Sequence, residues 1–304
     1  MITFAEQAAL FLDRAQKRKR NPVRESTVKV YRAAIKNHLN PKLGNLSLDV
    51  VGNAVVKVLV AEWAAAGMSP AQIVLNLGII KQIRASAVNE NGEELFPYTW
   101  NNEFMDIPSI GDQHQPVADA HTVTTLVKKA RKDVSALVAV LAGSGVRIAE
   151  ALAITGGWDD GASNFWDGEK IIVRAQRSGD TLLPVKTAAG EREVDLAPKL
   201  NDYLKRVIVG ESGEPLTGYM FPLEGGTYRT QLVDEGYKGG FHSFRRFRAT
   251  HLRMHGTPDP LVKFWLGHED ETVTDRYTKV GAEIEARRDE AARVGLGFKL
   301  PEGK

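Results

Sequence analysis

The sequence contains no cysteine. A chain without thiols forms no disulfide framework, no thiolate metal site and no cysteine nucleophile. The sequence also lacks an apolar run of the about 20 residues that span a bilayer. Its first residues do not show the basic and apolar segments of a secretory signal. We therefore expect a cytoplasmic protein that does not bind membranes.

The net charge is also small, because the chain has 40 basic and 38 acidic residues. The basic residues are unevenly distributed, however, since residues 1–42 contain ten of them and only three acidic residues. A local excess of this kind attracts a polyanion such as DNA. It also fits a solvated helix face, so charge alone leaves both interpretations open. The candidate DNA-binding residues here are Arg14, Lys17, Arg18, Lys19, Arg20 and Arg24.

The 304 residues suggest about two domains. Apolar residues recur at helical spacing over 4–12 and 25–39, and Pro41 is expected to stop the second of these helices. The pair Ser69-Pro70, a capping serine before a proline, predicts the start of another helix. The first hundred residues therefore predict a helical domain.

Residues 96–120 lack periodicity and contain prolines and polar residues, as a linker does. We place the helical domain at 1–104, the linker at 105–120, a second domain at 121–281 and a C-terminal tail at 282–304. Within the second domain, strands are predicted at 170–174, 181–185 and 191–196, between helical stretches. The expected fold is mainly α with a small β-sheet, a helical domain followed by a mixed α+β domain.

Arg147 follows the turn Gly143-Ser144-Gly145 at the start of a predicted helix that runs to about Ile154. An arginine at such a place can direct two parallel hydrogen bonds at a phosphate. Glu150, one turn later, would hold the guanidinium in place. Alone, an Arg–Glu pair at this spacing is usually an ordinary surface pair.

His242 and Arg245 lie three residues apart, so they share one face at the start of a predicted helix. Together they can bind an anion there. Phe244, Phe247 and Leu252 are the expected core contacts of this helix. Without further context, the segment also fits a solvated basic helix.

Three more candidates are ordinary residues when each is considered alone. Lys186 follows a predicted strand, and His268 comes directly after Gly267, which is expected to end a short helix. Tyr277 lies nine residues after His268. Because phenol has a pKa near ~10, a tyrosine nucleophile needs cationic neighbours or a base.

The order of these residues is more informative than any one of them. The chain resembles the tyrosine recombinases, also called phage-integrase-type site-specific recombinases, over about residues 120–280. The resemblance rests on AGSGVRIAEALAI, VKTAAGEREVDL, HSFRRFRATHLRMHG and LGHEDETVTDRYTKV. The first domain is similar to the family's core-binding domain through TVKVYRAAIKNHLNPKLGNLSL.

The resemblance implies that Tyr277 attacks a phosphodiester and forms a 3′-phosphotyrosyl link. Arg147 and Arg245 would then clamp the non-bridging oxygens. Lys186 would protonate the departing 5′-oxygen, with Lys170 as the alternative lysine.

The resemblance also implies that His242 and His268 hydrogen-bond the phosphate or handle the tyrosine proton. It adds Arg246 and Lys279 as DNA-binding residues, with double-stranded DNA as the partner and no metal or other cofactor. We further expect a homotetramer on paired sites, in which the tail is exchanged between subunits.

Two other functions fit part of this pattern. One is a catalytically silent DNA-binding regulator on the same scaffold, which could lose Tyr277 freely. The other is a type IB topoisomerase-like enzyme, which relaxes supercoils as a monomer. The complete set of side chains argues against the first, and the short two-domain layout argues against the second.

Overall fold

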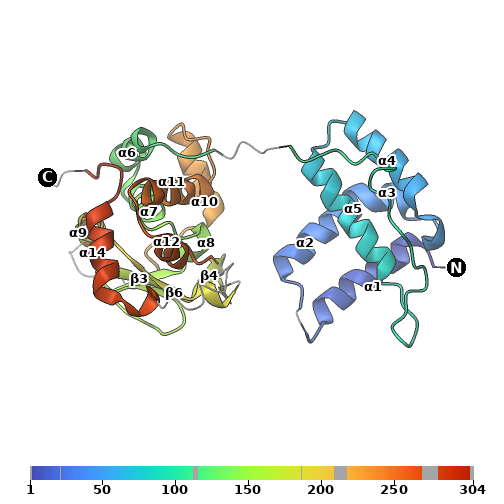
Figure 1. Cartoon of the computed structure of the whole chain (residues 1–304), viewed down its shortest axis with the longest axis horizontal. Coiled ribbons are helices and arrows are strands. Elements are labelled where there is room, and N and C mark those ends of the chain that lie inside the picture. The colour runs from blue at the N-terminus through green and yellow to red at the C-terminus, as the bar shows by residue number, and fades with distance from the viewer. Residues whose placement is uncertain are drawn as a thin grey trace. The chain divides into compact units, whose positions relative to one another are not determined.

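In the computed structural model the chain forms two compact units (Figure 1), residues 1–113 and 114–304. Each unit has a hydrophobic core of its own. The structure describes residues 2–20, 22–111, 116–185, 187–208, 218–268 and 280–301. Within these ranges no helix combines the length and the apolar character needed to cross a membrane.

The first unit consists of helices. They are α1 (Phe4–Lys17), α2 (Glu25–Ala34), the π-helical turn η1 (Ile35–Leu39), α3 (Asn40–Leu43), the 3-10 turn η2 (Leu48–Val50), α4 (Asn53–Ala65) and α5 (Pro70–Ala85). The predicted start of α5 is confirmed, because the Ser69 hydroxyl accepts the backbone N–H of Gln72 at 3.3 Å.

The prediction that Pro41 ends the second helix was wrong. The chain runs from α2 through η1 directly into α3, with Pro41 in the first turn of α3. The wider π turn pairs the Asn40 N–H with the Ile35 carbonyl. Pro41 has no N–H to donate, and its place in the first turn of α3 lets the helical chain continue past it.

The core of the first unit extends further along the chain than predicted. Met105 is fully buried in this core, and Phe96, Trp100 and Ile107 pack against it. The linker is predicted to begin at residue 105. Apolar side chains of an irregular segment can be buried without any periodicity, which is why the pattern did not reveal this packing.

The second unit surrounds one central helix, α7. The described helices of the unit are α6 (Ala120–Lys129), α7 (Lys132–Ser144), α8 (Ile148–Ala151), α9 (Pro198–Val207), α10 (Gly225–Asp234), α11 (His242–Met254), α12 (Asp259–Leu266) and α14 (Ile284–Val294), with 3-10 turns η3 (Ala188–Gly190) and η4 (Val280–Ala282). The strands are β1 (Ile154–Gly156), β2 (Asn164–Trp166), β3 (Lys170–Val173), β4 (Ala175–Ser178), β5 (Thr181–Pro184) and β6 (Arg192–Asp195).

The strands form a four-stranded sheet in the order β1-β2-β3-β6 and a separate β4–β5 hairpin. Among the described strand pairs, β1–β2 alone is parallel. The three predicted strands are confirmed as β3, β5 and β6. The helix predicted from Arg147 to Ile154 ends at Ala151 instead, because the chain turns there into β1. The predicted fold class, mainly α with a small sheet, is confirmed.

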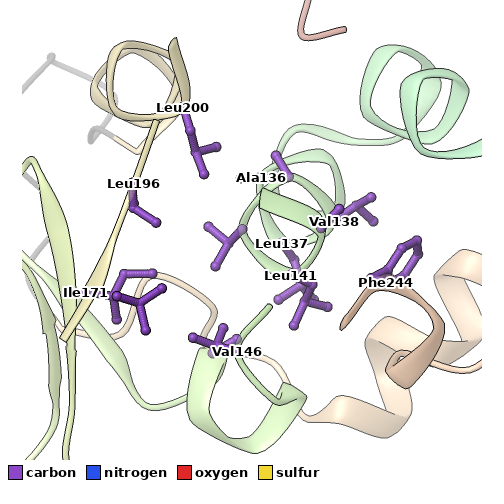
Figure 2. Packing of buried hydrophobic residues seen from close by; sticks show 14 of the residues in the cluster. Ala136, Leu137, Val138, Leu141, Val146, Ile171, Leu196, Leu200 and Phe244 are labelled. Atoms are coloured by element: carbon purple, nitrogen blue, oxygen red, sulfur yellow. The ribbon is translucent and has the colours of Figure 1, made fainter. Parts of the chain in front are cut away.

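Helix α7 is buried along most of its length. Figure 2 shows Leu137 and Leu141 of α7 between Ile171 of β3 on one side and Phe244 of α11 on the other. The helix runs on through the predicted turn and ends at Gly145, which has a φ of 77°. A Cβ on Gly145 would lie 2.7 Å from the Leu266 side chain, so glycine is required here.

Candidate active site

The chain leaves α7 at Gly145 and enters α8 two residues later, with Arg147 as the N-cap residue. The Arg147 backbone N–H donates to the Glu150 carboxylate at 2.9 Å, and Nη1 of Arg147 donates to it at 2.7 Å. The carboxylate therefore fixes the backbone and the guanidinium of Arg147 together. Glu150 itself is almost fully buried, whereas 36% of the Arg147 side chain is exposed.

Arg245 belongs to the first turn of α11 and is buried. Its Nη1 donates to the Gly145 carbonyl at 2.8 Å, and its Nη2 donates to the Leu266 carbonyl. These bonds bring the start of α11 beside the start of α8. Burial, followed by the positive charge of Arg147, lowers the pKa of Arg245 to about 9. Arg245 therefore stays positively charged at neutral pH.

Arg192 of β6 is a member of this site that the sequence reasoning missed. Its Nη2 donates to the Glu150 carboxylate at 2.9 Å, and its Nε donates to the Trp265 carbonyl at 2.7 Å. A third bond joins its Nη1 to the Gly190 carbonyl at 2.8 Å. The signal was present in the alternating stretch 191–196, because Arg192 shares a strand face with Val194, a buried position.

Three arginines from three elements meet the last carbonyls of α12. The carbonyls of residues 265–267 accept, in order, from Arg192 of β6, Arg245 of α11 and Arg147 of α8, the last at 3.5 Å. The C-terminal end of a helix carries partial negative charge, which favours cations there. We call Arg147, Arg192, Arg245 and Glu150 the arginine cluster.

The chain leaves α12 next to this cluster through a left-handed turn. Gly267 has a φ of 62°, its N–H bonds to the Phe264 carbonyl, and the His268 N–H bonds to the Lys263 carbonyl. This pair of bonds is a Schellman motif, which fixes the direction of the chain at His268. His268 therefore stands at a defined point beside the arginines.

His242 is the first residue of α11, one turn before Arg245. Partial burial lowers the pKa of His242, and the charges of Arg246 and Arg245 lower it further. Partial burial also lowers the pKa of His268, with Arg245 as the next cause. Both imidazoles are therefore neutral at neutral pH and able to accept a proton.

The arginine cluster has more positive than negative charge, since three arginines share one carboxylate. Arg192 and Arg245 are buried, while Arg147 presents its guanidinium to solvent. Buried charges normally occur in balanced pairs. A buried excess with one open side is suited to bind an anion, and the start of α11 adds its partial positive charge.

Three candidate residues, Lys186, Tyr277 and Lys279, lie outside the described residues. The alternative lysine, Lys170, lies on β3 and belongs to a different group of charges. Its Nζ pairs with Glu193 at 2.6 Å, and Glu193 also pairs with Arg287 of α14. Arg287 pairs in turn with Asp195 at 3.0 Å. We call these four residues the tail cluster, and the structure does not bring Lys170 to the arginine cluster.

The candidate DNA-binding residues of the first unit line the end of α1 and the connection to α2. Arg14 donates to the Ser86 carbonyl at 3.0 Å, and Lys17 pairs with Asp13 at 2.8 Å. Arg24 is the N-cap residue of α2. Arg18, Lys19 and Arg20 are exposed. In the second unit, Arg246 donates to the Pro116 carbonyl at 3.0 Å.

The geometry can be compared with known proteins. The model of the phage integrase family matches residues 117–283, and the model of the phage integrase N-terminal SAM-like domain matches residues 3–55. The chain belongs to the phage integrase family. The predicted tyrosine recombinase membership is thereby confirmed. A comparison with curated proteins found no match.

Solved integrases share the fold. A Tn1549 transposon integrase in complex with a circular intermediate DNA has a TM-score of 0.66 and 17% identity. The match covers 95% of this chain and 100% of that one. A lambda integrase tetramer bound to a Holliday junction has a TM-score of 0.59 and 15% identity, over 92% of this chain and 80% of that one. At these identities the likeness extends to the fold.

Proposed function

We propose that the protein is a site-specific DNA recombinase that breaks and rejoins strands through Tyr277. The observation that carries the proposal is the arginine cluster. It is a preorganised, partly open site with an excess of positive charge, and His268 leads from it into the segment that contains Tyr277. Membership of the phage integrase family supports the same function.

In the proposed reaction the Tyr277 oxygen attacks the scissile phosphorus. The new bond is a 3′-phosphotyrosyl ester, and the bond that breaks releases the 5′-oxygen, which takes a proton from Lys186. The five-coordinate phosphorus carries extra negative charge on its non-bridging oxygens. Arg147 and Arg245 stabilise that charge from fixed positions, so little reorganisation is needed at the moment of reaction.

His242 and His268 act at the edge of the site. As neutral bases beside the arginines, they hydrogen-bond the phosphate or accept the tyrosine proton. The phosphotyrosyl ester conserves the energy of the broken bond, so a 5′-hydroxyl of another strand reverses the step. The basic residues of α1 and its connection to α2, together with Arg246 and Lys279, hold the DNA through its phosphates.

We further propose that the protein assembles as a homotetramer on paired DNA sites. In the structure the tail packs on its own unit, where Arg287, Ala291 and Leu296 are buried. An exchanged tail would make the same contacts on a neighbouring subunit, as in domain swapping. Deletion of residues 282–304 should abolish assembly on DNA, and unchanged assembly would contradict the exchange.

The test of the reaction uses a nicked suicide substrate made from DNA that is covalently trapped in the native host. The parent chain should form an adduct that survives detergent. Tyr277→Phe should form none, whereas Tyr219→Phe, a control in the same unit, should form it normally. DNA binding without an adduct would favour the silent regulator, and relaxation of supercoiled DNA by a monomer would favour the topoisomerase.

A further inference from the structure

Arg192 is an enclosed member of the arginine cluster, with 1% of its side chain exposed. An arginine so enclosed cannot touch a DNA phosphate. Its donors are directed instead at Glu150, at the Trp265 carbonyl near the end of α12, and at the Gly190 carbonyl before β6. One guanidinium thus connects three elements around the open side of the site.

We propose that Arg192 is a positioning residue for the anion site, because it holds the Glu150 carboxylate in a buried ion pair and Glu150 in turn holds Arg147. This inference rests on the proposed function, in which Arg147 contacts the phosphate. In this scheme Arg147 binds the anion, and Arg192 acts only through Glu150.

Arg192 acts by favouring the ionised form of Glu150. Burial alone raises the pKa of a carboxyl group. The pKa of Glu150 is nevertheless lowered, because the charge and hydrogen bond of Arg192, followed by the two hydrogen bonds from Arg147, together outweigh burial. Arg147 is the weaker partner since its charge is partly screened by solvent, whereas Arg192 and Glu150 are both enclosed.

Loss of ionisation at Glu150 would release Arg147. A carboxylate accepts both bonds that Arg147 donates, one from the backbone and one from the guanidinium. A protonated carboxyl group carries an O–H donor on one oxygen, so it can accept fewer hydrogen bonds. It also attracts the guanidinium less because it has lost its negative charge. The Arg147 side chain would then adopt other rotamers and present fewer fixed donors to an anion.

The contact of Arg192 with the end of α12 serves the same purpose. A Cβ on Gly267 would lie 2.9 Å from Nη1 of Arg192. The guanidinium therefore packs directly under the turn from which His268 leaves the helix. Arg192 in this way supports the Arg147 side and the His268 side of the site at once.

Sulfate is a suitable probe, because it keeps its double charge across the pH range in which Glu150 would titrate. The measurements are sulfate affinity at several pH values and the pKa of Glu150, followed by carbon NMR of the side-chain carboxyl. In Arg192→Met the pKa of Glu150 should rise above the ordinary value of 4.5. Sulfate affinity should fall about tenfold at pH values below the new pKa, and it should recover as the pH rises through that value.

Two variants separate this role from a purely structural one. Arg192→Lys keeps the charge, so the pKa of Glu150 should stay below 4.5 and most sulfate affinity should return. Arg287→Met removes an equally buried arginine from the tail cluster. It should lower thermal stability while leaving the Glu150 pKa and its pH response unchanged.

Arg147→Met gives a decision even when Arg192→Met does not fold. The proposal requires the pKa of Glu150 to stay below 4.5 in this variant, because Arg192 is still present. A rise above that value would overturn the proposal. Sulfate affinity equal to that of the parent in Arg192→Met at every pH would overturn it as well.

These outcomes are independent of DNA cleavage. A parent chain that binds sulfate through Arg147 but forms no Tyr277 adduct would contradict the proposed function and leave the role of Arg192 intact. Suppose instead that the parent forms the adduct and that Arg192→Met leaves the pKa of Glu150 unchanged. That result would support the proposed function and contradict the role of Arg192.

Discussion

Neighbouring residues of β6 belong to two charge clusters that differ in their balance of positive and negative charge. Arg192 joins the arginine cluster, in which three arginines share one carboxylate. Glu193 and Asp195 join the tail cluster, in which two carboxylates meet two cations, Lys170 and Arg287. The first is charged and partly open, and the second is balanced.

The difference shows how the charge balance of a buried cluster can distinguish a structural role from a ligand-binding role. A balanced cluster satisfies its own charges and needs no ligand, so its role is to join α14 to the sheet. An unbalanced cluster is costly unless an anion completes it, and the helix carbonyls at residues 265–267 compensate only in part. We expect substitutions in the first to affect chemistry and those in the second to affect stability.

The largest effect is expected for Arg245→Lys. An ammonium group cannot keep the bonds to the Gly145 and Leu266 carbonyls and still present a planar pair of donors. The rate of strand cleavage should fall about 10³-fold, as when one preorganised donor is removed from a transition state. Arg253→Lys, an exposed substitution on the same helix, is the control. A loss smaller than about tenfold would argue against a clamp.

A smaller effect, about 10²-fold at neutral pH, is expected for His268→Asn, as for loss of a general base. The pKa of His268 is lowered, so the parent should keep its cleavage rate from neutral pH to below 6.5 and lose it as the imidazole becomes protonated. The variant should have a weaker acid limb in its pH–rate profile. His255→Asn serves as the control, and an unchanged limb in His268→Asn would rule out this role.

Glu150→Gln and Glu193→Gln compare the two clusters directly. Glu150→Gln should slow cleavage about tenfold, because the amide holds Arg147 less firmly than a carboxylate does. Glu193→Gln should lower the free energy of unfolding by about 1–2 kcal/mol, because it weakens a charged pair, with little change in cleavage per folded molecule. Denaturant unfolding and single-turnover cleavage measure the two quantities. Equal effects on cleavage would remove the distinction between the clusters.

The smallest effect is expected for Gly267→Ala. A left-handed backbone and a Cβ 2.9 Å from the Arg192 guanidinium should cost about 1–2 kcal/mol of stability and slow cleavage a few-fold. Gly256→Ala is the matched control, since Gly256 also has a positive φ of 74° but opens onto empty space. It should lose about 1 kcal/mol of stability without affecting cleavage. The same cleavage rate in both variants would show that Arg192 tolerates the displacement.

The sequence predicted the features that depend on neighbouring residues. Helix periodicity, the Ser69 cap and the glycine at the end of α12 follow from local rules, and these predictions were confirmed. The grouping of Arg147 with Arg245 came from the family resemblance. The strands β1 and β2, three residues each, are too short to show a period.

The features that sequence reasoning missed depend on distant parts of the chain. Arg192 is separated from Glu150 by 42 residues and from Trp265 by 73, so no local pattern indicates their contacts. The burial of Met105 likewise depends on the core of the first unit. Pro41 was misjudged because the π-helical turn before it changes which N–H groups need partners.

The burial of Arg192 and Arg245 has a consequence for how salt should act on the protein. The basic residues at 14–20 stand in solvent, where ions at physiological strength screen charges beyond about 8 Å. The buried guanidiniums are largely shielded from those ions. Capture of DNA should therefore weaken steeply with added salt, while the chemistry on DNA already bound continues at nearly the same rate. We therefore expect a salt-sensitive search for DNA and a salt-tolerant reaction in the same protein.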